Sequence, residues 1–242
     1  MKRALNACVV AAGVACGLAF ASAAFGQTVD EVLTKMSAKA ETIKDLQVTA
    51  KVTKFDSVFE EKSIMRLELF YKKPDLTRVD TFKTLGGREI QTQLVIIGKD
   101  FVLRAWPDTH KGELRRMPAD EMKRRREGRD DPMTFFSRKP EDLKRDFDVA
   151  LVPPPVPTAV KLTLKPKAAN KAVEYKTIEL VVDKTSWLPS AVRAMSGGEK
   201  DDWSMYEFTK VLINTSFSDA MFAIPGGFQI TEVDKDAPAK DK

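Results

Sequence analysis

The chain of 242 residues is poor in the side chains that carry most covalent and metal chemistry, with two cysteines and one histidine. Both cysteines, Cys8 and Cys16, lie in the first 26 residues, so a mature protein that begins after them has no thiol. A Ser-His-Asp site needs a histidine beside a nucleophile, and His110 lies in a polar, turn-like stretch with no serine motif around it. The sequence therefore favours a binding protein, with no catalytic residue, no metal site and no cofactor.

The sequence also lacks a large excess of positive or negative charge. Lys and Arg number 40 against 35 Asp and Glu, a formal net charge of +5. Domains that bind nucleic acid usually concentrate basic charge on one surface, so we expect no nucleic-acid partner. The acidic pairs Glu60-Glu61, Asp130-Asp131 and Asp201-Asp202 do not favour calcium binding, because adjacent side chains of an extended chain point to opposite sides.

Long apolar runs are confined to the N-terminus. Lys2 and Arg3 precede an acid-free apolar run that ends in small residues at positions 21–24 and 26. This order is typical of a secretory signal peptide, so we predict removal of residues 1–26 and a mature chain that starts near Gln27. The run also approaches the ~20 residues that span a bilayer. An uncleaved anchor and a lipoprotein signal around Cys16 therefore remain alternatives.

The spacing of apolar residues predicts a mainly β fold. Residues 29–43 carry one apolar stripe at helical spacing. From residue 46 to residue 230 the apolar positions mostly alternate, which indicates about eleven antiparallel strands separated by turns such as Gly86-Gly87. A sheet of that size tends to curl, so we expect one large curled antiparallel sheet that forms an incomplete barrel and is covered by helices.

One insert interrupts this ladder, at residues 118–147. It contains a charged, helix-like stretch and the neighbouring apolar residues Phe135 and Phe136. With the N-terminal helix it is the available cover for the concave face, so we predict a helical lid. We interpret the proline-rich loop at residues 153–157 as a crossover within the sheet, and the strands after it as a meander. Residues 27–233 then form a single domain, followed by a disordered tail at residues 234–242.

Five pieces of sequence occur in a recognisable order, and the first contains a basic residue before a turn proline. They are residues 69–76, residues 98–103 with 106–107, residues 162–167, residues 178–183 with 188–189, and residues 222–225. Together with the export signal they resemble the periplasmic outer-membrane lipoprotein carrier family, LolA, and its wider lipoprotein-sorting superfamily. The heavier charged insert and Lys73, which stands where the family has an arginine before the proline, indicate a divergent member.

The resemblance implies a monomeric carrier in the periplasm of a diderm bacterium. Such a carrier binds lipoprotein acyl chains, or another lipid, in a hydrophobic cavity and transfers them towards the outer membrane. Its partners are an inner-membrane donor complex and an outer-membrane acceptor. The resemblance also implies a set of lid and cavity residues, which are Lys73, Leu67, Leu69, Tyr71, Phe101, Leu103, Phe135 and Phe136.

Two alternatives stay open. A basic run could contact lipid headgroups or a protein partner, or could form a solvated helix face; it consists of Lys123, Arg124, Arg125 and Arg126. The protein could also be an envelope sensor, which uses the same fold to detect lipid or lipoprotein and then acts through a protein partner.

Overall fold

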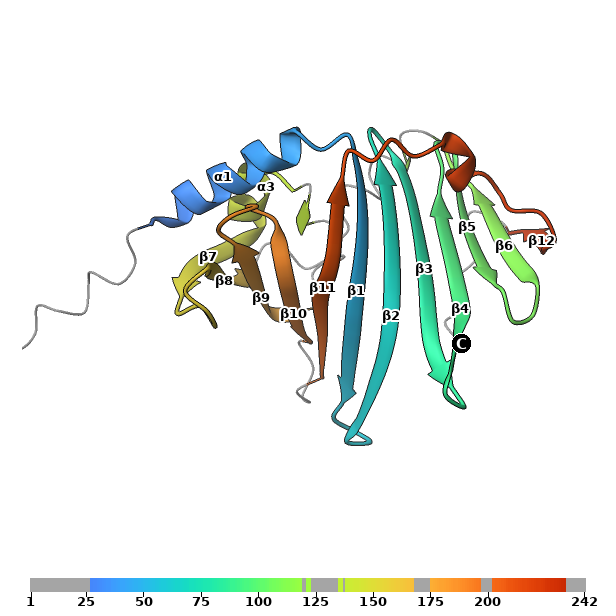
Figure 1. Cartoon of the computed structure of the whole chain (residues 1–242), viewed down its shortest axis with the longest axis horizontal. Helices are drawn as coiled ribbons and strands as arrows, with labels where there is room; N and C mark the ends of the chain where they lie inside the picture. Colours follow the sequence, from blue (N-terminus) through green and yellow to red (C-terminus); the bar gives the residue numbers. More distant parts are fainter. Residues whose placement is uncertain are drawn as a thin grey trace, which may run out of the picture.

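The computed structural model describes residues 27–118, 121–122, 135–136, 138–167, 175–196 and 202–233. One curved sheet of 12 strands dominates it, with the longer helices near one end and a short 3-10 helix near the other (Figure 1). The mainly β fold class expected from the sequence is confirmed. The helices are α1 (Val29–Glu41), α3 (Pro140–Asp146) and the 3-10 helix η2 (Asp219–Phe222). The strands are β1 (Asp45–Asp56), β2 (Glu61–Lys72), β3 (Leu76–Leu85), β4 (Arg88–Ile97), β5 (Phe101–Trp106), β6 (Lys111–Arg116), β7 (Phe147–Val152), β8 (Ala159–Pro166), β9 (Tyr175–Asp183), β10 (Pro189–Ser196), β11 (Trp203–Ile213) and β12 (Gln229–Glu232).

The strand order is β12-β6-β5-β4-β3-β2-β1-β11-β10-β9-β8-β7, so the sheet ends at β12 and β7 and does not close into a barrel. Two hairpin ladders, β1–β6 and β7–β11, meet in the middle, where β1 pairs with β11 from Leu46 to Phe55. The turn at Gly86-Gly87 has φ angles of 57° and 78°, which glycine adopts without strain. The expected turn at Gly86-Gly87 therefore lies where β3 and β4 meet.

Two details of the topology differ from the expectation. The proline-rich loop joins β7 to β8, which are antiparallel neighbours, so the prediction of a crossover at this loop is wrong. The last strand leaves the meander and pairs with β6 in parallel at the opposite edge, with Gln229 opposite Lys111. Alternation in a strand reports its two faces, but it does not report which strand pairs with it or in which direction.

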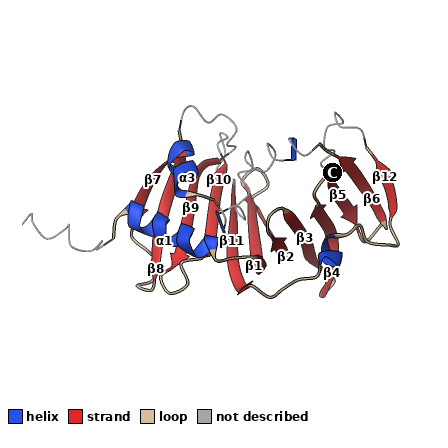
Figure 2. Cartoon of the chain, turned by 90° about the horizontal axis from the view of Figure 1, so that it is seen from above, coloured by secondary structure: helices blue, strands red, loops and turns tan. Residues whose placement is uncertain are grey.

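The sheet forms an arc when it is seen from above (Figure 2). The register of its strands determines which side chains lie on each of its two faces. We call inner the face that carries Leu46 and Val48, and outer the face that carries Phe70. Helix α1 packs on the inner face over β7–β10 with Val32, Leu33 and Met36. Its N-terminus is closed by a capping box, in which Thr28 and Glu31 each accept a backbone N–H of the other.

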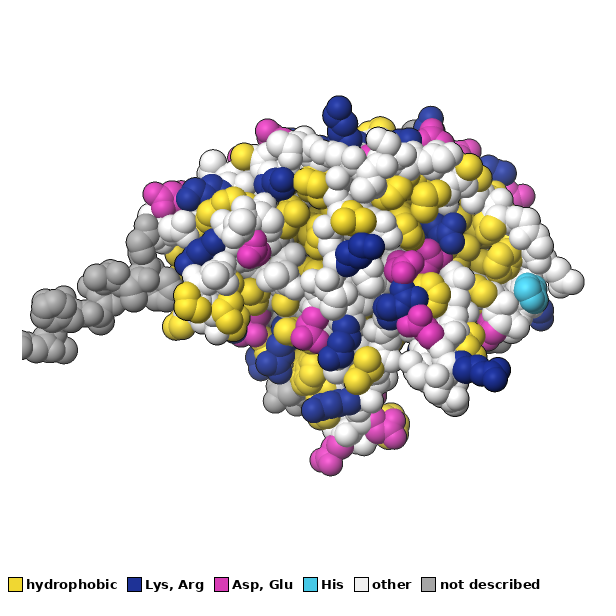
Figure 3. Space-filling model, viewed as in Figure 1, with side chains coloured by type: hydrophobic (Ala, Val, Ile, Leu, Met, Phe, Trp, Pro, Cys, Tyr) yellow, Lys and Arg dark blue, Asp and Glu magenta, His cyan; other side chains and the backbone are white. Residues whose placement is uncertain are grey.

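The outer face of β2–β6 is covered by residues 214–228, which precede β12 and which we call the C-terminal strap. Phe222 of η2 is 3% exposed and packs there among apolar side chains of β2, β4, β5 and β6. Buried Asp45 ties the strap to β1, because its carboxylate accepts hydrogen bonds from the backbone N–H groups of Thr215 and Ser216. Figure 3, in the view of Figure 1, shows charged side chains scattered among hydrophobic ones, as on an ordinary solvated surface.

Candidate functional site

The inner face of β1 and β2 is a continuous apolar surface. Leu46, Val48, Ala50 and Val52 point to this face from β1. Directly opposite them on β2 stand Tyr71, Leu69, Leu67 and Met65. Pairing with β11 extends the same rows through Ile213, Val211, Phe208 and Tyr206. Alternation in three adjacent strands thus gathers one apolar stripe at the centre of the sheet.

Burial of this stripe is uneven, although it is apolar throughout. Leu69 is 4% exposed. Its neighbours Leu67 and Tyr71 on the same face are only partly buried, as are Val79 of β3 and Phe208 of β11. Half-buried apolar side chains in a row are the kind of surface that binds another apolar group, because their burial is incomplete in the protein alone.

The insert places apolar side chains on the inner face. Phe136 is 4% exposed and lies edge-to-face against Phe208, with 4.9 Å between ring centroids. Phe135 is 3% exposed and packs with α1, α3 and β7–β10. Met122 is buried against Ile97 at the β4–β5 end of the same face. The structure therefore brings Phe135, Phe136, Leu67, Leu69 and Tyr71 to one face.

Phe101 and Leu103 do not join this group. Leu103 pairs with Ile96 of β4 and Leu114 of β6, and all three pack in the cluster of Phe70 and Phe222 on the outer face. Phe101 lies two residues before Leu103 on β5, so it points to the same face of the sheet. Its ring packs against Gly98, where an added Cβ would lie 2.2 Å from the ring. These two residues belong to the core beneath the C-terminal strap and cannot line an inner-face site.

Lys73 stands in the turn after β2, at the C-terminal end of α1. Its Nζ donates hydrogen bonds to the carbonyl oxygens of Ala40 and Glu41, at 3.1 Å each. These oxygens belong to the last turn of the helix, where the helix dipole places partial negative charge. Since the Lys73 backbone N–H also donates to the Lys44 carbonyl at 2.9 Å, the turn is connected to both ends of the segment that joins α1 to β1. Lys73 itself is exposed to solvent.

Helix α3 is held by a compact ion-pair cluster. Asp146 at its C-terminal end accepts hydrogen bonds from Arg145 at 2.8 Å and from Arg138 at 2.5 Å. The hydrogen bond from Arg145, followed by that from Arg138, holds the pKa of Asp146 below its usual value, against the opposing effect of burial. Lys144 of the same helix forms an ion pair with Asp30 of α1 at 2.5 Å, so the two helices are joined by charge as well as by apolar packing.

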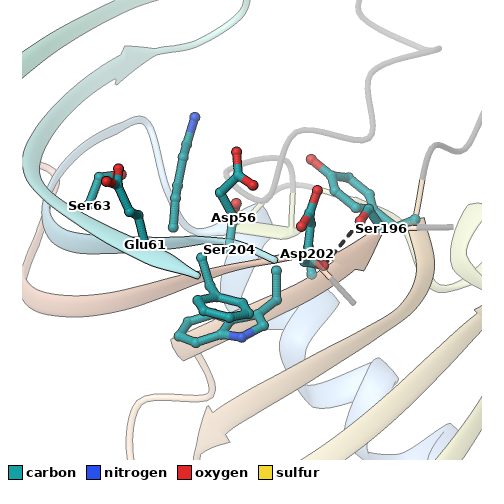
Figure 4. A pocket seen from close by; sticks show the side chains of 11 residues that line it. Asp56, Glu61, Ser63, Ser196, Asp202 and Ser204 are labelled. Atoms are coloured by element: carbon teal, nitrogen blue, oxygen red, sulfur yellow. Dashed lines mark hydrogen bonds between the residues drawn. The ribbon is translucent and has the colours of Figure 1, made fainter. Parts of the chain in front are cut away.

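A polar pocket adjoins the apolar stripe, at the end of β1 and β2 that carries the turn between them. Its volume is about 400 Å³. Ser196 donates to the backbone carbonyl of Asp202 at 3.1 Å (Figure 4). The Asp202 carboxylate accepts hydrogen bonds from the hydroxyl and the backbone N–H of Ser57. The lining residues are Lys54, Phe55, Asp56, Glu61, Ser63, Tyr175, Ala194, Ser196, Asp202, Trp203 and Ser204.

This pocket is not predictable from the sequence, because its residues come from β1, β2, β9, β10 and β11 and are brought together only by the register of these strands. A partial signal existed within single strands: the inner-face positions of β1 change from Val52 to Lys54 and Asp56. The basic run Lys123, Arg124, Arg125 and Arg126 lies outside the described residues. In the part of the chain that the structure describes, no group of three His, Cys, Asp or Glu side chains could hold a metal ion.

No protein-family model matches the sequence, and no curated protein matches it. Solved structures do. An uncharacterised conserved protein from Thermus thermophilus is 14% identical, with 86% of this chain and 100% of that chain covered and a TM-score of 0.52. A LolA superfamily protein from Nitrosomonas europaea is 11% identical, with coverages of 82% and 98% and a TM-score of 0.42. The lipoprotein LppX from Mycobacterium tuberculosis is 12% identical, with coverages of 79% and 99% and a TM-score of 0.44.

These likenesses concern the fold. The TM-score of 0.52 shows that the chain shares its overall fold with the Thermus protein. Among the described helices none is both long and apolar enough to cross a membrane.

Proposed function

We propose that the protein is a periplasmic carrier that binds the acyl chains of a lipoprotein, or of another lipid, on the inner face of the sheet. The observation that carries the proposal is the central apolar stripe of β1, β2 and β11, whose members Leu67, Tyr71 and Phe208 are only partly buried. Binding and release, and no covalent step, are the activity that this surface supports.

The energetic need for such a protein is large. Each CH₂ group that leaves water contributes about 0.8 kcal/mol, so an acyl chain cannot cross an aqueous compartment unaccompanied. A curved apolar sheet supplies the matching surface without polar backbone groups, since the strands satisfy one another. Half-buried side chains can then complete their burial against the acyl chain.

The cover of this face is the second part of the proposal. Phe135 and Phe136 from the insert and Val32, Leu33 and Met36 from α1 already pack on the inner face. A carrier must open this cover to accept an acyl chain, and weak polar contacts at its margin suit that task. The contacts of Lys73 with Ala40 and Glu41 are of this kind.

The donor, the acceptor and the compartment are extensions of the same proposal. An exported carrier takes its cargo from an inner-membrane donor complex and delivers it to an outer-membrane acceptor, acting as a monomer. The protein would then work in the periplasm of a diderm bacterium, after removal of residues 1–26. In the alternative function, lipid binding is a signal that changes affinity for a protein partner.

A pair of leucine variants tests the proposal. Leu67 points to the inner face and Leu212 to the outer face, on strands that both pair with β1, and both side chains are partly buried. Leu67→Ser should weaken the affinity for a hydrophobic fluorescent probe about tenfold. The affinity for a lauroyl-chain lipid, measured by displacement of the probe, should fall by a similar factor. Leu212→Ser should leave both unchanged.

The matched pair separates a binding defect from a folding defect, because both variants lose the same number of methyl groups. Thermal melting of each checks that the fold is retained. Equal probe affinity in the two folded variants and the wild type would reject the inner face as the binding surface. Lipid-dependent capture of a protein, with no transfer of lipid between vesicles, would favour the sensor.

A further inference from the structure

The inner face changes chemical character along the strands. Towards the turn between β1 and β2, each central strand passes from apolar to polar side chains on this face. On β1 the change follows Val52, on β2 it follows Met65 and on β11 it lies between Tyr206 and Ser204. The polar positions are those that line the pocket, among them Lys54, Ser63, Ser204 and Glu61. An amphiphile laid along these strands meets an apolar surface and a polar pocket in the order of its own tail and head.

The pocket has the size and the donors and acceptors of a site for a small polar group. Its volume of about 400 Å³ lies in the usual range for ligand pockets. Figure 4 shows the hydroxyl-bearing Ser63, Ser196 and Ser204 beside the carboxyl-bearing Asp56 and Glu61, from adjacent strands. Hydroxyl and carboxylate oxygens accept hydrogen bonds, and serine hydroxyls also donate them, so the lining complements a head that carries hydroxyl groups.

The charge of the lining adds selectivity. Among the described residues that line the pocket, Lys54 is the one cation, and Asp56, Glu61 and Asp202 carry carboxylates. An anionic head would meet net negative charge within a few ångströms, whereas an uncharged head would not. In a pocket open to water, repulsion between a phosphate and one nearby carboxylate weakens binding roughly threefold to tenfold.

From this geometry we propose that the pocket binds the polar head of the carried amphiphile, and that it selects an uncharged, hydroxyl-bearing head, such as a glyceryl group, over an anionic one. The inference rests on the proposed function, because it takes the acyl chain to lie on the adjoining apolar stripe. It assigns to the pocket a role in choosing cargo that the stripe alone, which contacts only the tail, does not have.

The test compares two ligands that share one lauroyl chain. Monolauroyl glycerol carries an uncharged glyceryl head, and lauroyl lysophosphatidylglycerol adds a phosphate to similar hydroxyl groups. Each displaces a hydrophobic fluorescent probe from the full chain, below the concentration at which micelles form. Wild type should bind the glyceryl lipid roughly threefold to tenfold more tightly than the phosphoglycerol lipid.

Glu61→Gln removes one carboxylate from the lining, and Glu60→Gln removes the same charge one residue away, outside it. Glu61→Gln should reduce the preference for the glyceryl lipid over the phosphoglycerol lipid by at least about half. Glu60→Gln should leave this preference unchanged. Ser204→Ala should weaken the glyceryl lipid two- to fivefold and leave dodecanol, which has a minimal head, unaffected.

The outcomes separate the two claims. Equal affinity for both lipids in all variants, with Leu67→Ser still weakening both, would overturn the head pocket and leave the carrier intact. The same change of preference in Glu60→Gln and Glu61→Gln would also overturn it, because a general surface charge would then explain the effect. Failure of every lauroyl ligand to displace the probe would overturn the carrier function and the head pocket with it.

Discussion

Removing the charged group of Lys73 measures how firmly α1 is held at the margin of the inner face. Its Nζ lies 3.1 Å from the carbonyl oxygens of Ala40 and Glu41, at the negative end of the helix dipole. A hydrogen bond from a charged donor is worth about 1.5–3 kcal/mol when it is well buried. Lys73 is exposed, so the contribution of a charge near an exposed helix end, about 0.3–1 kcal/mol, applies instead.

Lys73→Leu should therefore lower the free energy of unfolding by about 0.3–1 kcal/mol, which corresponds to about 1–4 °C in Tm for a domain of this size. Lys73→Arg should preserve or raise the Tm, because the guanidinium offers five donors to the same carbonyl oxygens. Calorimetry gives the Tm, and titration with a hydrophobic fluorescent probe reports access to the inner face, which should change in the Leu variant.

The control replaces Lys210, an exposed lysine on the outer face of β11, by leucine. The difference in Tm between the Lys73→Leu and Lys210→Leu variants should become smaller in 1 M salt, since screening weakens exposed electrostatic contacts. Equal Tm and equal probe affinity in wild type and in the Leu and Arg variants at position 73 would refute the reasoning. Lys73 would then be an ordinary solvated lysine of the turn.

Three further predictions concern the insert, the helices and the N-terminus. Replacing Phe135 and Phe136 together by serine should weaken probe binding if they close over the inner face, and unchanged affinity in a folded protein would exclude that role. Because the pKa of Asp146 is lowered in the folded protein, its ion pairs stabilise the fold at pH values above the unfolded pKa of about 3.9, and this stabilisation is lost as the pH falls through the lower folded pKa. Asp146→Asn should therefore lower the Tm at pH 7 and should make the Tm less dependent on pH below about pH 4. Parallel curves of Tm against pH for the variant and the wild type would contradict this. Intact-mass measurement of protein from the periplasmic fraction should give a chain that starts near Gln27, and a mass that includes Met1 or a lipid on Cys16 would contradict the export prediction.

The sequence was sufficient to predict most strands and hairpin turns, and the reason is local. Alternating positions such as Leu46 and Val48 define a strand with one apolar face, and glycine pairs such as Gly86-Gly87 mark the hairpin ends. Helix α1 was equally predictable, because its capping box and apolar stripe are contained in one short segment. Each of these features depends on neighbours in the sequence.

Features that depend on distant partners were not predictable. Alternation gives Phe101 and Leu103 a common face, but only pairing with β4 and β6 decides that it is the outer one. The position of β12 beside β6 depends on how the C-terminal strap crosses the sheet. The polar pocket likewise needs the relative register of β1, β2 and β11, which no single strand encodes.

The central claim is that the inner face holds an acyl chain in the cell. Native mass spectrometry of the protein, purified without detergent from its own envelope, tests this most directly. The account predicts a bound species whose mass, after release and fragmentation, contains a fatty-acyl chain, and predicts its loss in Leu67→Ser but not in Leu212→Ser. A protein that carries no lipid or acylated peptide in this measurement, or that retains the bound species equally in both variants, would contradict it.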